Sequence, residues 1–300
     1  MTRIGAPQRA PIPFQVSPFR MLIDGITTEQ IPASDRGLHY GDGLFETIAV
    51  AASRPRLWER HMARLAEGER RLGLPPLPRD LLWSEAESLI SGAQQGVLKI
   101  LHTRGSGGRG YRSPTPASTR RILSFHPWPE FPRYWFREGI ELRLCDTRLG
   151  INPALAGIKH LCRLEQVLAR NEWDDPAIPE GVMLDIEGRV IEGTQSNLFL
   201  LKNGGLITPD LSRCGVAGVM RGLVLESARA LGIDCLIRDL GVDELGTADG
   251  VFICNSLIGI VLVARFAAHK FDPKLIPSEL VETVRQRAFG QRDATLLSSG

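Results

Sequence analysis

Two short segments carry the residues of this chain that are best suited to do chemistry. AGIKHLCRLEQ places Lys159 where we expect the apolar start of a helix, and VIEGTQSN places Glu192 at the end of a predicted hairpin. Burial disfavours an ammonium ion and lowers its pKa, so a desolvated Lys159 would be an amine nucleophile. A lysine at the edge of a helix more often extends its amine to water. The role of Lys159 as a nucleophile is therefore a hypothesis that needs support from other parts of the chain.

Three further patterns are suited to binding an anion. GVAGVMR runs from a loop into a predicted helix, so the amides of Gly218 and Val219 would face outward at the positive end of the helix dipole. Asn255 and Ser256 follow a predicted strand and offer more donors, although an ordinary strand-end turn also explains them. Arg64, in HMARL, is either a phosphate clamp or a surface residue like its neighbours.

Taken together, these features match the needs of one cofactor. A lysine amine, a single carboxylate, an arginine and two backbone anion sites are the parts that hold pyridoxal phosphate (PLP). The lysine would form the Schiff base, the carboxylate would face the pyridine nitrogen, and the other groups would form the phosphate cup. We expect PLP as the cofactor and no metal.

A glycine-rich segment at residues 105–110 matches the dinucleotide-binding pattern Gly-x-Gly-x-x-Gly and follows a predicted strand. That pattern requires a helix to begin at the loop. Pro114 and Pro116 prevent a helix here, and the Lys-Ser/Thr ending of a P-loop is missing. We expect either a plain hairpin connection or a loop that carries Arg109 and Tyr111 over a pocket.

Composition excludes several other function classes. The 36 basic and 34 acidic residues leave a net charge of +2 without a basic tract, so we expect no nucleic-acid partner. The longest apolar stretch, 257–264, is predicted to be a buried strand and is too short to span a bilayer, and the Pro-rich N-terminus lacks the apolar region of a secretory signal. The five cysteines are widely spaced without a Cys-x-x-Cys pair, which favours reduced thiols and a cytoplasmic location.

Strand and helix signals alternate in two blocks, which predicts an α/β (α+β) fold. In the first block we expect a hairpin at 21–31 turning at Asp24-Gly25, strands at 44–50, 97–103 and 121–125, and helices at 61–72 and 79–92. In the second we expect a strand at 140–146, the helix of Lys159, a hairpin at 182–192 turning at Glu187-Gly188, strands flanking Asn203-Gly204 and near residues 235 and 251, and helices at 218–231 and 277–288.

The blocks divide the chain into domains. Residues 1–18 are predicted to be a flexible arm, 19–125 a small N-terminal domain and 135–290 a large C-terminal domain, with a tail at 291–300. Between the domains we place a linker at 126–134, because prolines at 127, 129 and 132 prevent a helix or a central strand.

Several segments resemble, in chain order, the fold-type IV PLP enzymes. They are RGLHYGDGLFE at 36–46, HMARL at 61–65, Lys159, EGTQSNLF at 192–199 and GVMR at 218–221. This group contains branched-chain aminotransferases, D-amino acid aminotransferases and 4-amino-4-deoxychorismate lyases. The resemblance implies a smaller N-terminal α/β domain, a larger C-terminal mixed α/β domain that binds PLP, and a homodimer with the pocket between the domains.

The resemblance also implies residue roles. Lys159 would be the catalytic residue that carries the cofactor, and Glu192 would pair with the protonated ring nitrogen. The phosphate would be held by Arg64, Gly218, Val219, Asn255 and Ser256. The expected substrate-binding residues are His39, Tyr40, Arg109 and Tyr111.

Within the group, residues 98–111 and 152–168 are most similar to the lyases. The resemblance then implies cleavage of 4-amino-4-deoxychorismate to 4-aminobenzoate and pyruvate, a step of folate biosynthesis, with Lys159 as base and then acid. The sequence around Tyr40 and Glu46 is also similar to that of aminotransferases, so a D-amino acid or branched-chain aminotransferase is the alternative. A non-catalytic PLP-binding homologue is a third hypothesis.

Overall fold

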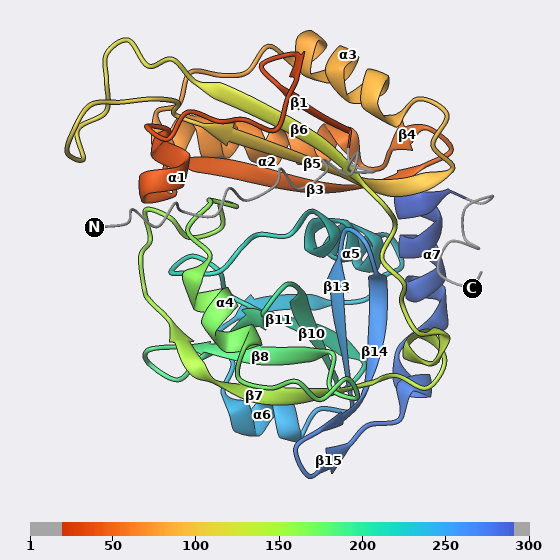
Figure 1. Ribbon diagram of the computed structural model, residues 1–300. Helices are drawn as coiled ribbons and strands as arrows, with labels where there is room; N and C mark the ends of the chain where they lie inside the picture. The colour runs from red at the N-terminus through yellow and green to blue at the C-terminus, as the bar shows by residue number, and fades with distance from the viewer. Residues whose placement is uncertain (1–19, 291–300) are drawn as a thin grey trace, which may run out of the picture.

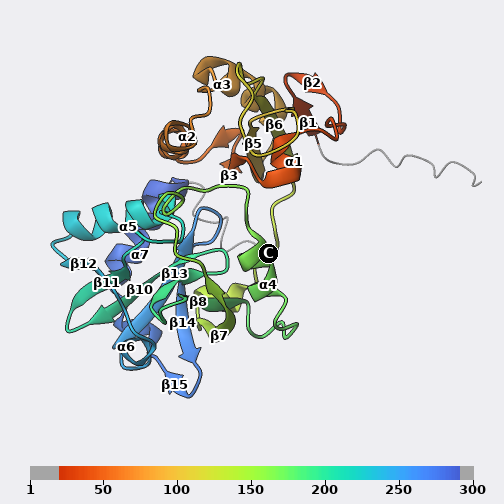
Figure 2. The ribbon, with the colours of Figure 1, turned by 90° about the vertical axis from the view of Figure 1, so that its left-hand side faces the viewer.

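Two β-sheets, one from each half of the chain, organise the molecule (Figure 1). The structure is a computed structural model that describes residues 20–290. The predicted arm at 1–18 and tail at 291–300 lie outside the described residues. Figures 1 and 2 both place β3 (Gly43–Ala51) on the side of the first sheet that is turned toward the second sheet. Side chains of β3 can therefore reach residues of the C-terminal half.

The first sheet is antiparallel, with the strand order β2-β1-β6-β5-β3-β4. Its other strands are β1 (Arg20–Ile23), β2 (Ile26–Thr27), β4 (Arg54–Pro55), β5 (Gln95–Thr103) and β6 (Arg120–His126). Helix α1 (Arg36–Tyr40) precedes β3, while α2 (Trp58–Leu72) packs on β3 and α3 (Arg79–Ile90) packs on β6. The fully buried Ile48, Leu98 and Ile100 lie in the core beneath these helices.

The second sheet is mixed, with the order β12-β11-β10-β13-β14-β7-β8-β9 and β15 beside β14. Its strands are β7 (Ile140–Leu149), β8 (Glu180–Asp185), β9 (Val190–Gly193), β10 (Asn197–Lys202), β11 (Gly205–Pro209), β12 (Cys235–Arg238), β13 (Gly250–Asn255), β14 (Gly259–Phe266) and β15 (His269–Lys270). The α-helices are α4 (Leu164–Arg170), α5 (Val219–Ala230), α6 (Val242–Gly246) and α7 (Ser278–Phe289), and short 3-10 helices occur at Arg133–Phe136 and Pro273–Leu275. Helices α5 and α7 pack on each other (Figure 1).

The predicted turns are confirmed. Asp24 and Gly25 have φ of 53° and 83°, and Asn203 and Gly204 have φ of 52° and 79°, so each pair adopts the left-handed conformation that a tight two-residue hairpin needs. The hairpin of β8 and β9 turns between Asp185 and Val190, at the predicted Glu187-Gly188. Helix α2 ends at Leu72, and Gly73 follows it as the C-cap with a φ of 60°. This left-handed conformation cannot extend a right-handed helix.

Six short elements were not predicted: α1, β4, α6, β15 and the two 3-10 helices. Each has two to five residues, which is too short for a periodic pattern. The domain boundaries at 125 and 135 stay a proposal, which rests on the two sheets sharing no strand in residues 20–290. Within the same residues no helix is both long and apolar enough to cross a membrane.

Candidate active site

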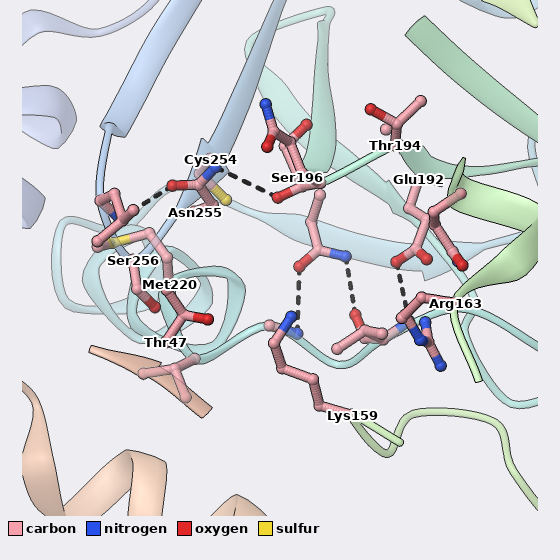
Figure 3. Close-up of a pocket in the computed structure, with 18 of the residues that line it drawn as sticks. Thr47, Lys159, Arg163, Glu192, Thr194, Ser196, Met220, Cys254, Asn255 and Ser256 are labelled. Atoms are coloured by element: carbon pink, nitrogen blue, oxygen red, sulfur yellow. Dashed lines mark hydrogen bonds between the residues drawn. The ribbon is translucent and has the colours of Figure 1, made fainter. Parts of the chain in front are cut away.

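Residues from both halves of the chain line one cavity of about 480 Å³ (Figure 3). Phe45, Thr47 and Arg64 come from the N-terminal half. The other lining residues come from the loop of Lys159, α4, β9 and the segment that follows it, the start of α5, and the end of β13. The cavity brings together seven residues that the sequence predicted: Arg64, Lys159, Glu192, Gly218, Val219, Asn255 and Ser256.

Lys159 lies in an extended segment and not at the start of a helix, so that prediction was wrong. Helix α4 begins at Leu164. The backbone around the lysine is bonded to β3 instead, because Phe45 N donates to Lys159 O at 3.0 Å and Leu161 N donates to Gly43 O at 3.0 Å. These bonds fix Lys159 against a strand that is more than a hundred residues away in sequence.

The environment of the Lys159 amine suits a nucleophile and base. Burial, and after it the nearby Arg64 cation, lower the pKa of Lys159 to about 8, although Glu46 and Glu192 oppose the change. The Nζ atom lies 4.2 Å from the centroid of the Phe45 ring. A substantial neutral fraction is therefore present slightly above neutral pH.

Glu192 lies in β9 as a buried carboxylate that accepts one hydrogen bond from within residues 20–290, from Val216 N at 2.8 Å. Burial raises the pKa of Glu192 to about 7, although the Val216 amide and the Arg163 and Lys159 cations favour its charged form. Such a carboxylate is poised to receive a cationic N–H from a ligand, because a partner there would stabilise its charge.

The N-terminus of α5 forms an anion site. Its N-cap is Gly218, which provides no side-chain cap for the first amides of the helix. Asn197 holds the entry to the helix, since its Oδ1 accepts from Gly218 N at 3.1 Å and its Nδ2 donates to Val216 O at 2.9 Å. A Cβ on residue 218 would lie 2.0 Å from Asn197 Oδ1, so this approach requires glycine.

Arg64 faces the same end of the cavity but is largely committed to Glu46. Its Nε and Nη2 donate to the two Glu46 oxygens at 2.8 and 2.5 Å, and its Nη1 donates to Ala217 O at 3.3 Å beside the start of α5. Asn255 and Ser256 also line the cavity, where Asn255 Nδ2 donates to Gln195 O at 3.2 Å. These groups fit a phosphate, with free helix amides, a hydroxyl and an oriented guanidinium.

Residues 43–266 match the amino-transferase class IV family. This chain belongs to that family. It is 37% identical to an aminodeoxychorismate lyase of Vibrio harveyi over 82% of this chain and 91% of the relative. The crystal structure of 4-amino-4-deoxychorismate lyase from Pseudomonas aeruginosa is similar with a TM-score of 0.85 and 49% identity, covering 89% of this chain and 98% of that chain. A bifunctional aminodeoxychorismate lyase / D-amino acid transaminase of Mycobacterium tuberculosis is 26% identical, over 82% of this chain and 87% of the relative.

The family match and the similarity to the Pseudomonas aeruginosa crystal structure confirm the predicted α/β fold. Within residues 20–290, no cluster of three His, Cys, Asp or Glu side chains is placed to hold a metal ion. The donors that line the cavity are instead an amine, amides, a hydroxyl and guanidinium groups, which suit an organic phosphate.

The four residues predicted to bind substrate do not line the cavity of their own chain. They gather around α1, where the rings of His39 and Tyr40 and of Tyr40 and Tyr111 make edge-to-face contacts, with centroids 5.7 and 5.4 Å apart. Arg36 Nη2 donates to Tyr111 O at 2.9 Å, and the Tyr111 side chain is 86% exposed. The loop that carries Arg109 begins no helix within residues 104–119, and the substrate role of all four stays a prediction.

Glu180 is a structural support that sequence reasoning missed. Its buried carboxylate accepts from the amide and hydroxyl of Thr194 at 2.9 and 2.6 Å and from the Ser196 hydroxyl at 2.8 Å. Residues 194–196 line the cavity directly after Glu192. Glu180 thereby fixes the loop that separates β9 from β10. Glu180 begins the buried strand β8, whose next residues look like those of any buried strand. The sequence indicated its role only by placing a carboxylate where an apolar residue is usual.

Proposed function

We propose that this protein is a PLP-dependent lyase that converts 4-amino-4-deoxychorismate into 4-aminobenzoate and pyruvate. One observation carries the proposal: the buried amine of Lys159 shares a cavity with the carboxylate of Glu192 and the uncapped start of α5. The names of the Vibrio harveyi and Pseudomonas aeruginosa relatives support the lyase over other activities in the family. The product 4-aminobenzoate would place the enzyme in folate biosynthesis.

Different residues of the cavity would hold different parts of the cofactor. Lys159 would bond the aldehyde carbon, Glu192 would accept a hydrogen bond from the protonated ring nitrogen, and Arg64, Ser256, Asn255, Gly218 and the amide of Val219 would surround the phosphate. When bound, PLP supplies an electron sink for the carbon next to the substrate nitrogen. The negative charge of Glu192 keeps that sink effective, because it favours the protonated ring.

Lys159 also moves the protons. Its amine, when it is free and neutral, would take the proton from the substrate ring carbon that bears nitrogen. The bond to the enolpyruvyl ether oxygen then breaks as the substrate ring becomes aromatic, and Lys159 returns a proton to the departing enol carbon to give pyruvate. The reaction consumes no water and no second substrate.

A coupled pyruvate assay tests the proposal. Cofactor-loaded protein should release pyruvate and 4-aminobenzoate in equal amounts from 4-amino-4-deoxychorismate without any keto acid. Protein that fails to bind PLP would refute the enzyme assignment. Protein that binds PLP yet turns over neither this substrate nor any amino acid would be a non-catalytic homologue.

Transaminase activity is the second candidate, favoured by the bifunctional relative from Mycobacterium tuberculosis. The same active-site lysine serves both reactions, so the cavity does not separate them. Incubation with a D-amino acid or a branched-chain amino acid and 2-oxoglutarate should then yield glutamate. A glutamate rate above the pyruvate rate would make transamination the main activity.

We further propose that the active form is a homodimer. Helix α4 exposes Leu164, Val167 and Leu168, which are 70%, 50% and 53% accessible and lie at the i, i+3, i+4 spacing of one helix face. Val167 also lines the cavity, so a second copy on this face would cover its entrance. Sedimentation should show a dimer that L164E/L168E converts to monomer. A stable, fully active wild-type monomer would contradict the proposal.

A cytoplasmic location is also proposed. Cys145, Cys162, Cys214, Cys235 and Cys254 are all free, as expected of a protein kept in a reducing compartment. Fractionation of cells with an antibody to the protein would test this, and recovery outside the cytoplasm would contradict it.

A further inference from the structure

A second cavity, of about 670 Å³, lies in the C-terminal half of the chain. Its walls come from the two 3-10 helices, Arg133–Phe136 and Pro273–Leu275, and from β14 and α7. No residue within 20–290 lines both this cavity and the active-site cavity. Figure 1 shows β14 and α7 side by side and away from α4, which borders the active site. The second cavity is therefore a separate space, and its volume is typical of small-molecule sites.

Apolar side chains form the inner wall of this second cavity. Ile260 and Ile276 are buried in the core between the second sheet and α7. Phe136, Leu262 and Val281 are half-buried and also line the cavity. A half-buried apolar side chain gains free energy when a ligand removes its remaining surface from water. The wall can therefore hold the apolar part of a ligand.

The charged residues of the second cavity are mostly cations. One carboxylate, Glu282, lines it together with four cations: Arg133, Arg137, Lys274 and Arg285. Glu282 is already paired, because its Oε2 lies 2.7 Å from Arg285 Nη2. Within residues 20–290, no Asp or Glu oxygen lies within 4.0 Å of the side-chain nitrogens of Arg133, Arg137 or Lys274. The cavity thus has an excess of positive charge.

The arrangement of these cations differs from that of ordinary surface residues. A surface cation more often extends its head group into water without a ligand. Here Arg133 and Arg137 meet Lys274, which lies more than a hundred residues later in the chain, beside an apolar wall. Helix α7 also begins at this cavity without a side-chain cap, which adds the positive end of its dipole. Charge and shape therefore favour a ligand with an anionic end and an apolar body.

We propose that the second cavity binds a small organic anion. The apolar body of the ligand lies against the wall that contains Ile260 and Val281, and its oxyanion is held by Arg133, Arg137 and Lys274. The planar forks of the two arginines suit the oxygens of a carboxylate, sulfonate or phosphate, and the lysine adds a compact charge. This site is independent of the reaction proposed above, so its test requires no turnover.

A fluorescence titration tests the proposal. The probe is anilinonaphthalene sulfonate (ANS), an aromatic anion whose emission increases in apolar surroundings. It is added to protein saturated with PLP, so that the active-site cavity is occupied. The test variant, R133Q/R137Q/K274Q, removes the three cations. The matched control, R54Q/R229Q/K270Q, removes three equally exposed cations that line neither cavity.

The test variant should bind ANS about tenfold or more weakly than wild type, because it lacks the charge-assisted contacts to the sulfonate. The control variant should bind ANS as wild type does. Two further compounds separate the parts of the ligand. Phenylnaphthylamine, which has the aromatic body without the charge, should bind wild type more weakly than ANS does. Orthophosphate at matched ionic strength should displace little ANS, because it leaves the apolar wall uncovered.

V281E is a second variant, in case the triple variant fails to fold by circular dichroism. It places a carboxylate among the cations and should also weaken ANS binding. The inference is overturned if a folded variant of either kind binds ANS within about twofold of wild type. Equal affinity of wild type for phenylnaphthylamine and ANS would overturn it without any variant. A changed sedimenting mass of the triple variant would assign this face to a contact between copies of the chain and would also overturn it.

Discussion

Glu46 in the first sheet and Glu192 in the second are both buried carboxylates that act on Lys159, yet their charges are controlled in opposite ways. Burial alone would raise the pKa of each. Two cationic nitrogens of Arg64 and the His61 ring at 2.6 Å outweigh burial and lower the pKa of Glu46 to about 2. Glu192 has one backbone amide and more distant cations, so burial prevails and raises its pKa to about 7.

The difference shows that partners at hydrogen-bond distance, and not depth of burial, decide the charge of a buried carboxylate. Glu46 is already satisfied and serves to orient Arg64. Within residues 20–290 no cation lies at salt-bridge distance from Glu192, which is the condition in which a ligand N–H gains most from binding. Both carboxylates interact electrostatically with Lys159, since each opposes the lowering of its pKa.

The largest effect on activity is expected from removing the Lys159 amine, which interacts with both carboxylates. K159A should lower pyruvate release by about a thousandfold or more, because the same group carries the cofactor and moves the proton. The coupled assay measures the loss. K270A is the control, since Lys270 is exposed on β15, and it should match wild type. Turnover by K159A within tenfold of wild type would remove Lys159 from the mechanism.

Breaking the Glu46 pair should destabilise the fold. E46Q leaves Arg64 without its counter-charge, and loss of one member of a buried pair costs about 3 kcal/mol of unfolding free energy. Urea denaturation of the cofactor-free protein measures this change. E67Q is the control on the same helix, because Glu67 pairs with Arg70 at the surface and should change stability little. Equal stability of E46Q and wild type would show that the pair is not a structural element.

Neutralising Glu192 should affect turnover more than folding. E192Q keeps the shape and loses the charge proposed to favour the protonated cofactor ring, so kcat should fall by about a hundredfold. Steady-state kinetics and the absorption spectrum of the loaded protein measure the effect. E187Q, in the exposed turn of the same hairpin, is the control. An unchanged kcat in E192Q would assign the ring nitrogen to another residue.

The smallest effect is a pH dependence of stability in the cofactor-free protein. The folded pKa of Glu192 lies above its ordinary value of 4.5, so its contribution to stability is fully present below pH 4.5 and is lost as the pH rises to about 7. Glu46 has the opposite sign, with stability present above pH 4.5 and lost toward pH 2. Between pH 4.5 and 7, E192Q should gain on the order of 2 kcal/mol relative to wild type. Parallel stability curves over that window would show that Glu192 titrates normally.

Local features of this protein were determined by the sequence. Asp24-Gly25 and Asn203-Gly204 predict tight turns because few residues adopt positive φ. Gly73 marks the end of α2 for the same reason. Lys159 and Glu192 were recognisable as a pair because their surrounding segments resemble those of a known family, and both line the cavity.

Only the tertiary structure decided how these residues are placed and charged. The local sequence suggests that Lys159 starts a helix, but its carbonyl accepts a hydrogen bond from Phe45 N of β3 instead of from a helical neighbour. The pairing of Glu46 with Arg64 is likewise set by packing between segments. Local pattern encodes backbone preference, whereas burial and partner distance, which set the pKa of each group, depend on contacts between residues far apart in the chain.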